Sequence, residues 1–292
     1  MTKAFSWGAA AALAAMLAGP TLAHAKISVV TSFTILADLA HNVGGDRIEV
    51  RSLVGPNSDV HSYVPSPADA KVLAGAKIVI LNGLGLEGST ARFMSESAKG
   101  ARAVIASAGV APLRLRGEPD PHAWQSVANA KIYVINIRDA LIEADPADRS
   151  TFEANAAAYL LRLDALDAEV KTALVTIPPD RRKLITTHDA FGYFGTAYGV
   201  EFIAPYGVST EAEASARAVA LVITQIRRER IPAVFLENIT DPRLLERIAR
   251  ESGARLGGTL YSDALTGPEG PVPTYIDLIR HNVKQLVTAL GA

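Results

Sequence analysis

Positions 148 to 176 of the chain read DRSTFEANAAAYLLRLDALDAEVKTALVT, a stretch with neither glycine nor proline. It is rich in Ala, Leu, Glu and Arg, which are good helix formers, and Pro178 and Pro179 end the pattern. A helix of about 28 residues would be roughly 40 Å long at 1.5 Å per residue, long enough to run along a two-lobed molecule. Its apolar side chains recur at helical spacing, at Tyr159, Leu160, Leu163, Leu166 and Val170.

Short β-rich runs alternate with helical patterns on both sides of this stretch. Before it we expect strands at 27–31, 48–54, 78–81 and 103–105, and helices at 35–43, 68–73 and 87–98. After it we expect strands at 184–187, 201–204 and 233–236, and helices at 191–198, 212–229, 242–252 (with Asp241 as N-cap) and 275–290. This rhythm is typical of parallel sheets covered by helices on both faces. The sequence therefore predicts an α/β fold of two β/α lobes with mainly parallel sheets, residues 26–147 and 178–292, joined by one long rigid helix at 148–177.

The N-terminus carries the features of an export signal. Lys3 precedes an alanine-rich apolar run at positions 9–18, and Ala23-His24-Ala25 gives the small-x-small pattern that signal peptidase reads. The run is shorter than the roughly 20 apolar residues that span a bilayer. We therefore expect a signal peptide at residues 1–25, cleaved after Ala25, and a soluble protein in the periplasm.

The composition limits the kinds of partner and of membrane attachment that we expect for this protein. The sequence contains no cysteine, so it offers neither disulfides nor a lipid-acceptor thiol at the cleavage site. This predicts free diffusion rather than a membrane tether. The 29 basic and 30 acidic residues nearly balance, which does not favour a nucleic-acid or membrane-surface partner. We expect a monomer.

Three of the six histidines stand in turn-rich or strand-end segments. His61 follows Gly-Pro-Asn-Ser-Asp-Val, His122 follows Glu-Pro-Asp-Pro, and His188 directly follows Leu-Ile-Thr-Thr. His24 belongs to the predicted signal, and His41 and His281 lie on predicted helices, where we expect solvated side chains.

Asp263 adds a carboxylate after the apolar run at 256–260. Ligands of open α/β sheets bind at the carboxyl ends of strands, so His61, His122, His188 and Asp263 could meet between the lobes. Imidazole and carboxylate are good ligands for zinc and its neighbours. The intervals match no short metal motif, and hydrogen-bonded loop histidines remain the alternative at this point.

Several segments of the sequence resemble the metal-binding solute-binding proteins of zinc and manganese ABC importers, known as cluster A-I. The likeness covers essentially the whole chain after the predicted signal, and its motifs come in the family's order. They are DVHSYVPSPAD at 59–69, IVILNGLGLE at 78–87, DPHAW at 120–124, HDAFGYF at 188–194 and STEAEAS at 209–215.

The resemblance implies two α/β lobes joined by a rigid helix, with one metal ion buried between them. It matches the family's four ligands, in order, to His61, His122, His188 and Asp263. In the family a histidine at the third position goes with zinc, whereas manganese binders tend to carry a carboxylate there. The implied function is capture of one Zn²⁺ ion and its delivery to an ABC-type permease in the inner membrane.

The chain departs from the family pattern in two places. The loop LRLRGEP at 113–119 is short and has no histidine, whereas many zinc members carry a loop rich in histidine and acid there. A separate periplasmic metal donor could serve that role. The tryptophan motif continues as Gln125-Ser126-Val127 rather than Leu-Asp-Pro, which could alter the contacts behind the ligands.

Alternatives remain at this stage. A manganese or iron importer component is the main one. A zinc hydrolase would leave an open position for water, but no His-Glu-x-x-His or His-x-His-x-Asp signature is present, and we expect no enzyme.

Asp59, Asp120 and Glu237 could orient ligand histidines through the other ring nitrogen, with solvated carboxylates as the alternative.

Overall fold

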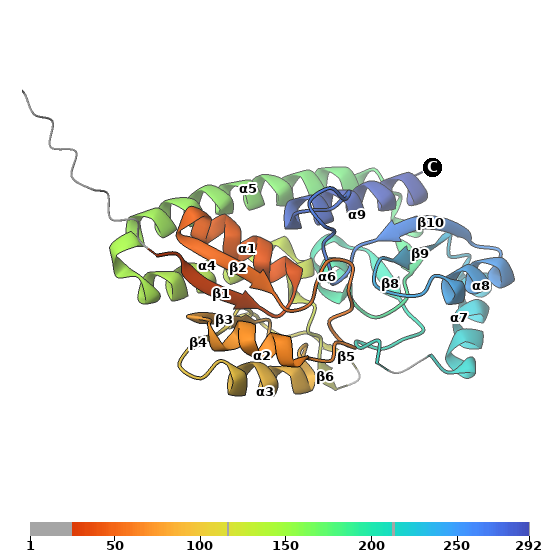
Figure 1. The fold of residues 1–292 in the computed structure, drawn as a ribbon. Coiled ribbons are helices and arrows are strands. Elements are labelled where there is room, and N and C mark those ends of the chain that lie inside the picture. Colours follow the sequence, from red (N-terminus) through yellow and green to blue (C-terminus); the bar gives the residue numbers. More distant parts are fainter. Residues whose placement is uncertain (1–24, 116, 212–213, 292) are drawn as a thin grey trace, which may run out of the picture.

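Two four-stranded sheets dominate the computed structural model, which describes residues 25–115, 117–211 and 214–291 (Figure 1). The first sheet has the order β2-β1-β3-β4 and the second the order β10-β9-β7-β8, and all strand pairs in both are parallel. The first comprises β1 (Ile27–Thr31), β2 (Ile48–Ser52), β3 (Ile78–Leu81) and β4 (Arg102–Ile105). The second comprises β7 (Lys183–Ile185), β8 (Glu201–Ile203), β9 (Ala233–Glu237) and β10 (Arg255–Leu260). The predicted fold of two parallel-sheet lobes with a long helix is confirmed.

Helices connect the strands and cover both faces of each sheet (Figure 1). In the first lobe they are α1 (Thr34–Gly44), α2 (Pro67–Ala74), α3 (Gly88–Ser97) and α4 (Val127–Ala144). The long helix is α5 (Arg149–Val175), and the second lobe holds α6 (Gly192–Tyr198), α7 (Ala216–Glu229), α8 (Arg243–Ser252) and α9 (Tyr275–Leu290). A two-stranded antiparallel hairpin, β5 (Arg114–Leu115) and β6 (Glu118–Pro119), lies between β4 and α4. The lobe boundaries at 147 and 178 stay a prediction.

Each sheet is buried on both faces because successive side chains of a strand point to opposite sides. In β1, Val29 belongs to the core beneath α1, α4 and α5, whereas Val30 packs with Leu73 of α2 and Met94 of α3. Apolar runs without alternation are typical of such doubly covered strands. This explains why Ile78–Leu81 is apolar and buried at every position.

One apolar core extends through both lobes along α5. Phe152 at one end of the helix and Leu174 near the other are both buried in a single cluster, which also contains Val29 of the first sheet and Leu184 of the second. A hinge motion that separated the lobes would expose this apolar surface to water, at about 25 cal/mol per Å². The packing therefore favours a fixed arrangement of the lobes.

Helix α4 is absent from the sequence-based expectation. It runs beside α5 and buries Tyr133, Val134, Ile137 and Leu141. The segment is rich in β-branched and asparagine residues, which are weak helix formers, so packing rather than propensity decides its structure.

Two expected helix starts also differ. Helix α8 begins at Arg243 with Pro242 as N-cap, so the assignment of Asp241 as N-cap is wrong by one residue, although its Oδ1 accepts the Arg243 N–H at 3.0 Å. Helix α7 begins at Ala216 because the Ser215 hydroxyl accepts the N–H of Ala218 and caps the helix. Positions 212–213 lie outside the described residues.

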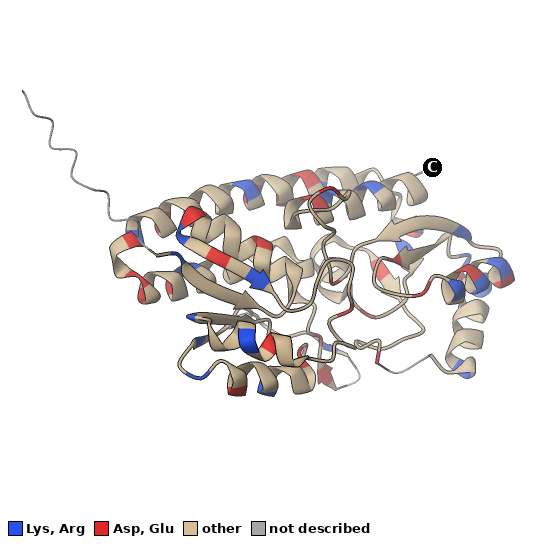
Figure 2. Cartoon of the chain, in the orientation of Figure 1, with Lys and Arg blue, Asp and Glu red and all other residues tan. Residues whose placement is uncertain are grey.

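Charges of both signs are interspersed along α5 and α8 (Figure 2). Arg280 of α9 pairs with Glu169 of α5 at 2.8 Å, with both side chains about half exposed, and such pairs contribute about 0–1 kcal/mol.

The predicted signal peptide lies outside the described residues except for Ala25. Within the described residues, no helix is both long and apolar enough to cross a membrane.

Candidate metal centre

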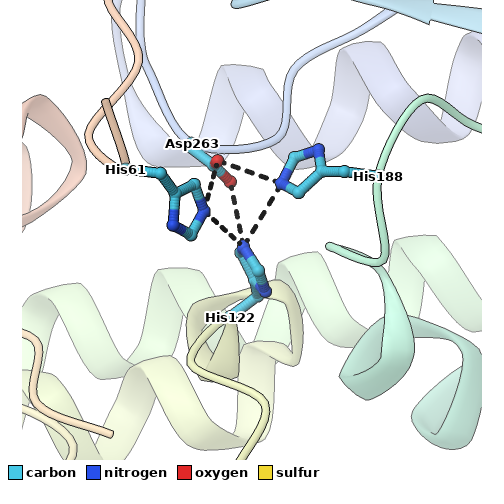
Figure 3. A group of neighbouring side chains, drawn as sticks. All are labelled: His61, His122, His188 and Asp263. Carbon is cyan, nitrogen blue, oxygen red and sulfur yellow. Dashed lines mark hydrogen bonds and ion pairs between the residues drawn. The ribbon is translucent and has the colours of Figure 1, made fainter. Parts of the chain in front are cut away.

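Four loops that each lead from a strand toward a helix bring the predicted ligands together. His61 lies between β2 and α2, His122 between the β5–β6 hairpin and α4, His188 between β7 and α6, and Asp263 between β10 and α9. Figure 3 shows all four side chains pointing toward a common centre. Two come from each lobe, so the structure places the cluster between the lobes, as the sequence predicts.

The distances within the cluster are short. His122 Nε2 lies 3.2 Å from His61 Nε2 and 3.3 Å from His188 Nε2. Asp263 Oδ2 lies 3.4 Å from His61 Nε2 and 3.2 Å from His188 Nε2, and Oδ1 lies 3.7 Å from His122 Nε2. The side chain of His61 is 4% exposed, and the other three are fully buried.

These separations fit one small cation. A tetrahedral zinc ion with Zn–N bonds of 2.0–2.1 Å requires ligand atoms about 3.3 Å apart. Facing ring nitrogens at such distances need a proton or a cation between them, because two imidazole lone pairs repel one another. Both oxygens of Asp263 are buried and accept no well-oriented hydrogen bond from the described residues. The geometry and the unpartnered carboxylate therefore both point to a cation at the centre.

Buried carboxylates hold two of the histidine rings from behind. Asp120 Oδ1 lies 2.8 Å from His122 Nδ1, and Glu237 Oε2 lies 2.6 Å from His188 Nδ1. A proton on His122 Nδ1 donated to Asp120 leaves its Nε2 free to ligate, whereas the contact of His188 with Glu237 has the distance of an ion pair. Glu237 also accepts the backbone N–H of His188 through Oε1 at 3.0 Å. Asp120 and Glu237 thus contact the rings as the sequence analysis suggested.

Asp59 plays a different part from the one suggested. Its Oδ1 accepts the backbone N–H of His61 at 2.9 Å rather than a ring proton, and its Oδ2 accepts the hydroxyl of Thr210 from the other lobe at 2.5 Å. It therefore fixes the loop of His61 and joins the two lobes beside the site. His281 also differs from expectation, because its Nε2 lies 3.1 Å from the Thr259 carbonyl and its ring packs against Tyr261.

Burial and charge perturb the pKa values of the cluster. Burial lowers the pKa of His122, against the opposing effect of Asp263 and Asp120. For His188 burial acts in the same direction, but the carboxylates of Glu237 and Asp263 raise the pKa well above its usual value. Burial would raise the pKa of Asp263, yet His188 and His122 hold it well below its usual range.

The affinity for zinc should fall as the pH is lowered from 6.5 to 5.5, because the ion must displace protons from its histidine ligands. In this window His188 carries a proton in the metal-free protein because its pKa is raised, and the ion must displace that proton. Asp263, whose pKa is held well below its usual range, takes up no proton there, so the fall in affinity reports on the histidines. Competition titrations at several pH values measure the slope. A flat profile would contradict histidine ligation.

Replacing Glu237 by glutamine should weaken zinc binding by about 10- to 100-fold, as is usual when a partner behind a metal-bound histidine is lost. The amide keeps an oxygen for the backbone but removes the negative charge at His188 Nδ1. Glu96→Gln on the exposed surface of α3 is the matched control, with wild-type affinity expected. Equal affinity of Glu237→Gln and the control would rule out the orienting role.

Other residues around the site could not be assigned a role from the sequence. The Tyr193 hydroxyl, in the second lobe, accepts the N–H of Leu113 at 3.0 Å and donates to the carbonyl of Asp120 at 3.1 Å. It thereby holds both ends of the hairpin that precedes His122. At Gly192 a Cβ would lie 2.6 Å from Asp120 Oδ2, so only glycine allows this approach. The HDAFGYF motif was the only signal, and it carries no spatial information.

The fold and the site together define a two-lobed α/β protein with a buried metal-binding cluster between its lobes. Residues 29–289 match the family model described as zinc-uptake complex component A, periplasmic. The chain therefore belongs to this family, the solute-binding proteins of metal ABC importers, and the resemblance seen in the sequence is confirmed.

Several relatives are similar over nearly their full length. The chain is 39% identical to the iron-binding protein YfeA of Yersinia pestis, with 91% of this chain and 87% of the relative covered. It is 32% identical to the manganese ABC transporter substrate-binding lipoprotein PsaA of Streptococcus pneumoniae, with 91% and 89% covered. The solved structure of the periplasmic zinc-binding protein TroA of Treponema pallidum superimposes with a TM-score of 0.89 at 31% identity, covering 92% of this chain and all of that one.

Proposed function

We propose that this chain captures one zinc ion outside the cytoplasm, through His61, His122, His188 and Asp263, and delivers it to an ABC-type permease. The observation that carries the choice of zinc is the presence of three buried imidazole nitrogens and one carboxylate. Nitrogen-rich tetrahedral sites suit zinc, whereas manganese prefers oxygen-rich sites with more ligand atoms. His188, backed by Glu237, is the residue that makes the set nitrogen-rich.

Manganese or iron is the second candidate for the cargo. The printed names of the Yersinia and Streptococcus relatives are those of an iron-binding and a manganese ABC transporter protein. Imidazole also binds iron, and the order of affinities places zinc above both manganese and iron for a given site. The alternative would be favoured if the cluster widened to admit further ligand atoms.

Delivery rather than hydrolysis follows from the ligand set. A zinc hydrolase keeps one coordination position open for water, whereas Asp263 would occupy the fourth position here. The family consists of transport components, so we infer a permease as the receiving partner and the periplasm as the compartment. The hairpin sequence at 113–119 contains no histidine, so the proposal is direct capture of free ions or receipt from a separate donor.

Metal content together with a competition titration tests this proposal. Protein purified without added metal should contain about one zinc ion per chain, as measured by elemental analysis. The metal-free protein should then prefer zinc to manganese by several orders of magnitude in a titration with a chromogenic chelator. Equal affinities, or purification with manganese or iron, would assign the cargo to the second candidate.

A further inference from the structure

Trp124 and Gln125 form a buried link between the His122 loop and the Asp263 loop. They belong to the short 3₁₀ helix Ala123–Gln125 that directly follows His122. The indole N–H of Trp124 donates to the Ser262 carbonyl at 3.0 Å, and the amide Nε2 of Gln125 donates to the same oxygen at 2.7 Å. Since Ser262 precedes Asp263, one lobe directly holds the peptide that carries the carboxylate of the other.

Two donors on one carbonyl restrict the peptide more than one does. A single hydrogen bond lets the peptide plane turn about the bond, whereas a second donor from another direction fixes the plane. The preceding residue, Tyr261, is held on both its N–H and its carbonyl by the side chain of Asn282, at 2.8 and 2.7 Å. With Gln125 in place, the backbone on the N-terminal side of Asp263 has little freedom left.

Gln125 supplies this second donor although the burial of its amide group is unfavourable. Its side chain is fully buried, and its Oε1 has no hydrogen-bond partner among the described residues. A buried unpaired amide oxygen is destabilising relative to an apolar side chain of the same size. Leucine would fill a similar volume without that penalty. The glutamine therefore contributes something other than stability, and its one strong contact is with the Ser262 carbonyl.

The orientation of Asp263 bears on which ion fits. As placed, its oxygens lie 3.2–3.7 Å from the three Nε2 atoms, the spacing of a small tetrahedral shell. Manganese takes up more than four ligand atoms. Both oxygens of Asp263 already face the histidines, so an ion that needs more ligand atoms requires the Asp263 loop to move outward and the cluster to widen. A fixed peptide at Ser262 opposes that movement.

We propose that Gln125 is a positioning residue for Asp263 and, through the Ser262 carbonyl, a determinant of selectivity for zinc over manganese. The inference rests on the proposed zinc function. The proposal predicts that Gln125 can be replaced by an apolar residue without loss of folding. The same replacement should lower the ratio of the zinc affinity to the manganese affinity.

The test compares Gln125→Leu with wild type and with Gln225→Leu, which makes the same chemical change on α7. Zinc and manganese dissociation constants come from chelator competition, and the melting temperature is measured on the metal-free protein. The zinc-to-manganese affinity ratio of Gln125→Leu should fall about tenfold, at the lower end of effects from residues behind metal ligands. Its melting temperature should be equal to or above that of wild type. Gln225→Leu should keep the wild-type ratio.

A ratio within twofold of wild type, or equal losses for both metals with a lower melting temperature, would overturn the proposal. Trp124→Phe removes the other donor and keeps the aromatic packing against Phe33. Because both donors share one carbonyl, the double variant should lose more selectivity than the product of the single changes; a simple product would contradict the shared mechanism. The zinc-to-manganese affinity ratio of the wild-type protein tests the proposed zinc function by itself. Failure of the zinc function can therefore be distinguished from failure of the proposal for Gln125.

Discussion

His188→Ala is expected to lower the affinity for zinc by about 60- to 700-fold. Zinc binding by four protein ligands is worth about 10–16 kcal/mol, so one ligand contributes about 2.5–4 kcal/mol, and every 1.4 kcal/mol is tenfold. His188 is fully buried and its Nε2 lies against both His122 and Asp263. Chelator competition measures the loss.

The control for this experiment concerns Glu237. Without His188 the buried carboxylate of Glu237 would lose its ion pair, and an unpaired buried charge is destabilising. The double variant His188→Ala/Glu237→Gln removes that charge and should fold with a melting temperature nearer to wild type. A zinc affinity within tenfold of wild type in either folded variant would exclude His188 as a ligand.

Zinc should raise the melting temperature by about 10 °C at a free concentration 1,000 times its dissociation constant. Mass action then stabilises the native state by about 4 kcal/mol, and each kcal/mol shifts the melting temperature by about 2–4 °C in a domain of this size. Manganese at the same free concentration should give a much smaller shift, because it binds a nitrogen-rich site more weakly. Differential scanning fluorimetry in metal-buffered solutions measures both.

Chelation provides the control for this prediction. A strong chelator added with zinc should return the melting temperature to that of the metal-free protein, because the shift depends on free ion. Equal shifts for zinc and manganese at equal free concentration would remove the basis for the zinc preference. A shift for neither metal would show that the cluster does not bind them in the native state.

Local sequence signals predicted elements with strong patterns and missed those that depend on packing. The region of α5 combines helix-forming residues with helical spacing of apolar side chains over seven turns, so it was predicted to within a residue or two. The segment of α4 has a weaker propensity and is helical because its apolar face packs against α1 and α5. Propensity cannot report a contact that exists only after the chain has folded.

The candidate site divides in the same way. His61, His122, His188 and Asp263 could be named because loops after strands and the family motifs marked them. The roles of Gln125, Tyr193 and the Ser262 carbonyl could not be named, since each depends on a contact across more than 70 positions of sequence. In the sequence Gln125 is only a departure from the family motif, and no local pattern indicates that its side chain reaches the other lobe.

The long helix has a consequence for how such proteins diversify. Helix α5 and its core hold the two sheets at a set separation but contribute none of the four clustered side chains, which all come from loops. Substitutions in those loops can therefore alter the cargo while the frame that supports them stays intact. Relatives with iron, manganese and zinc in their names align along nearly the whole chain. This is expected if evolution has changed the ligand loops and conserved the scaffold of sheets and long helix.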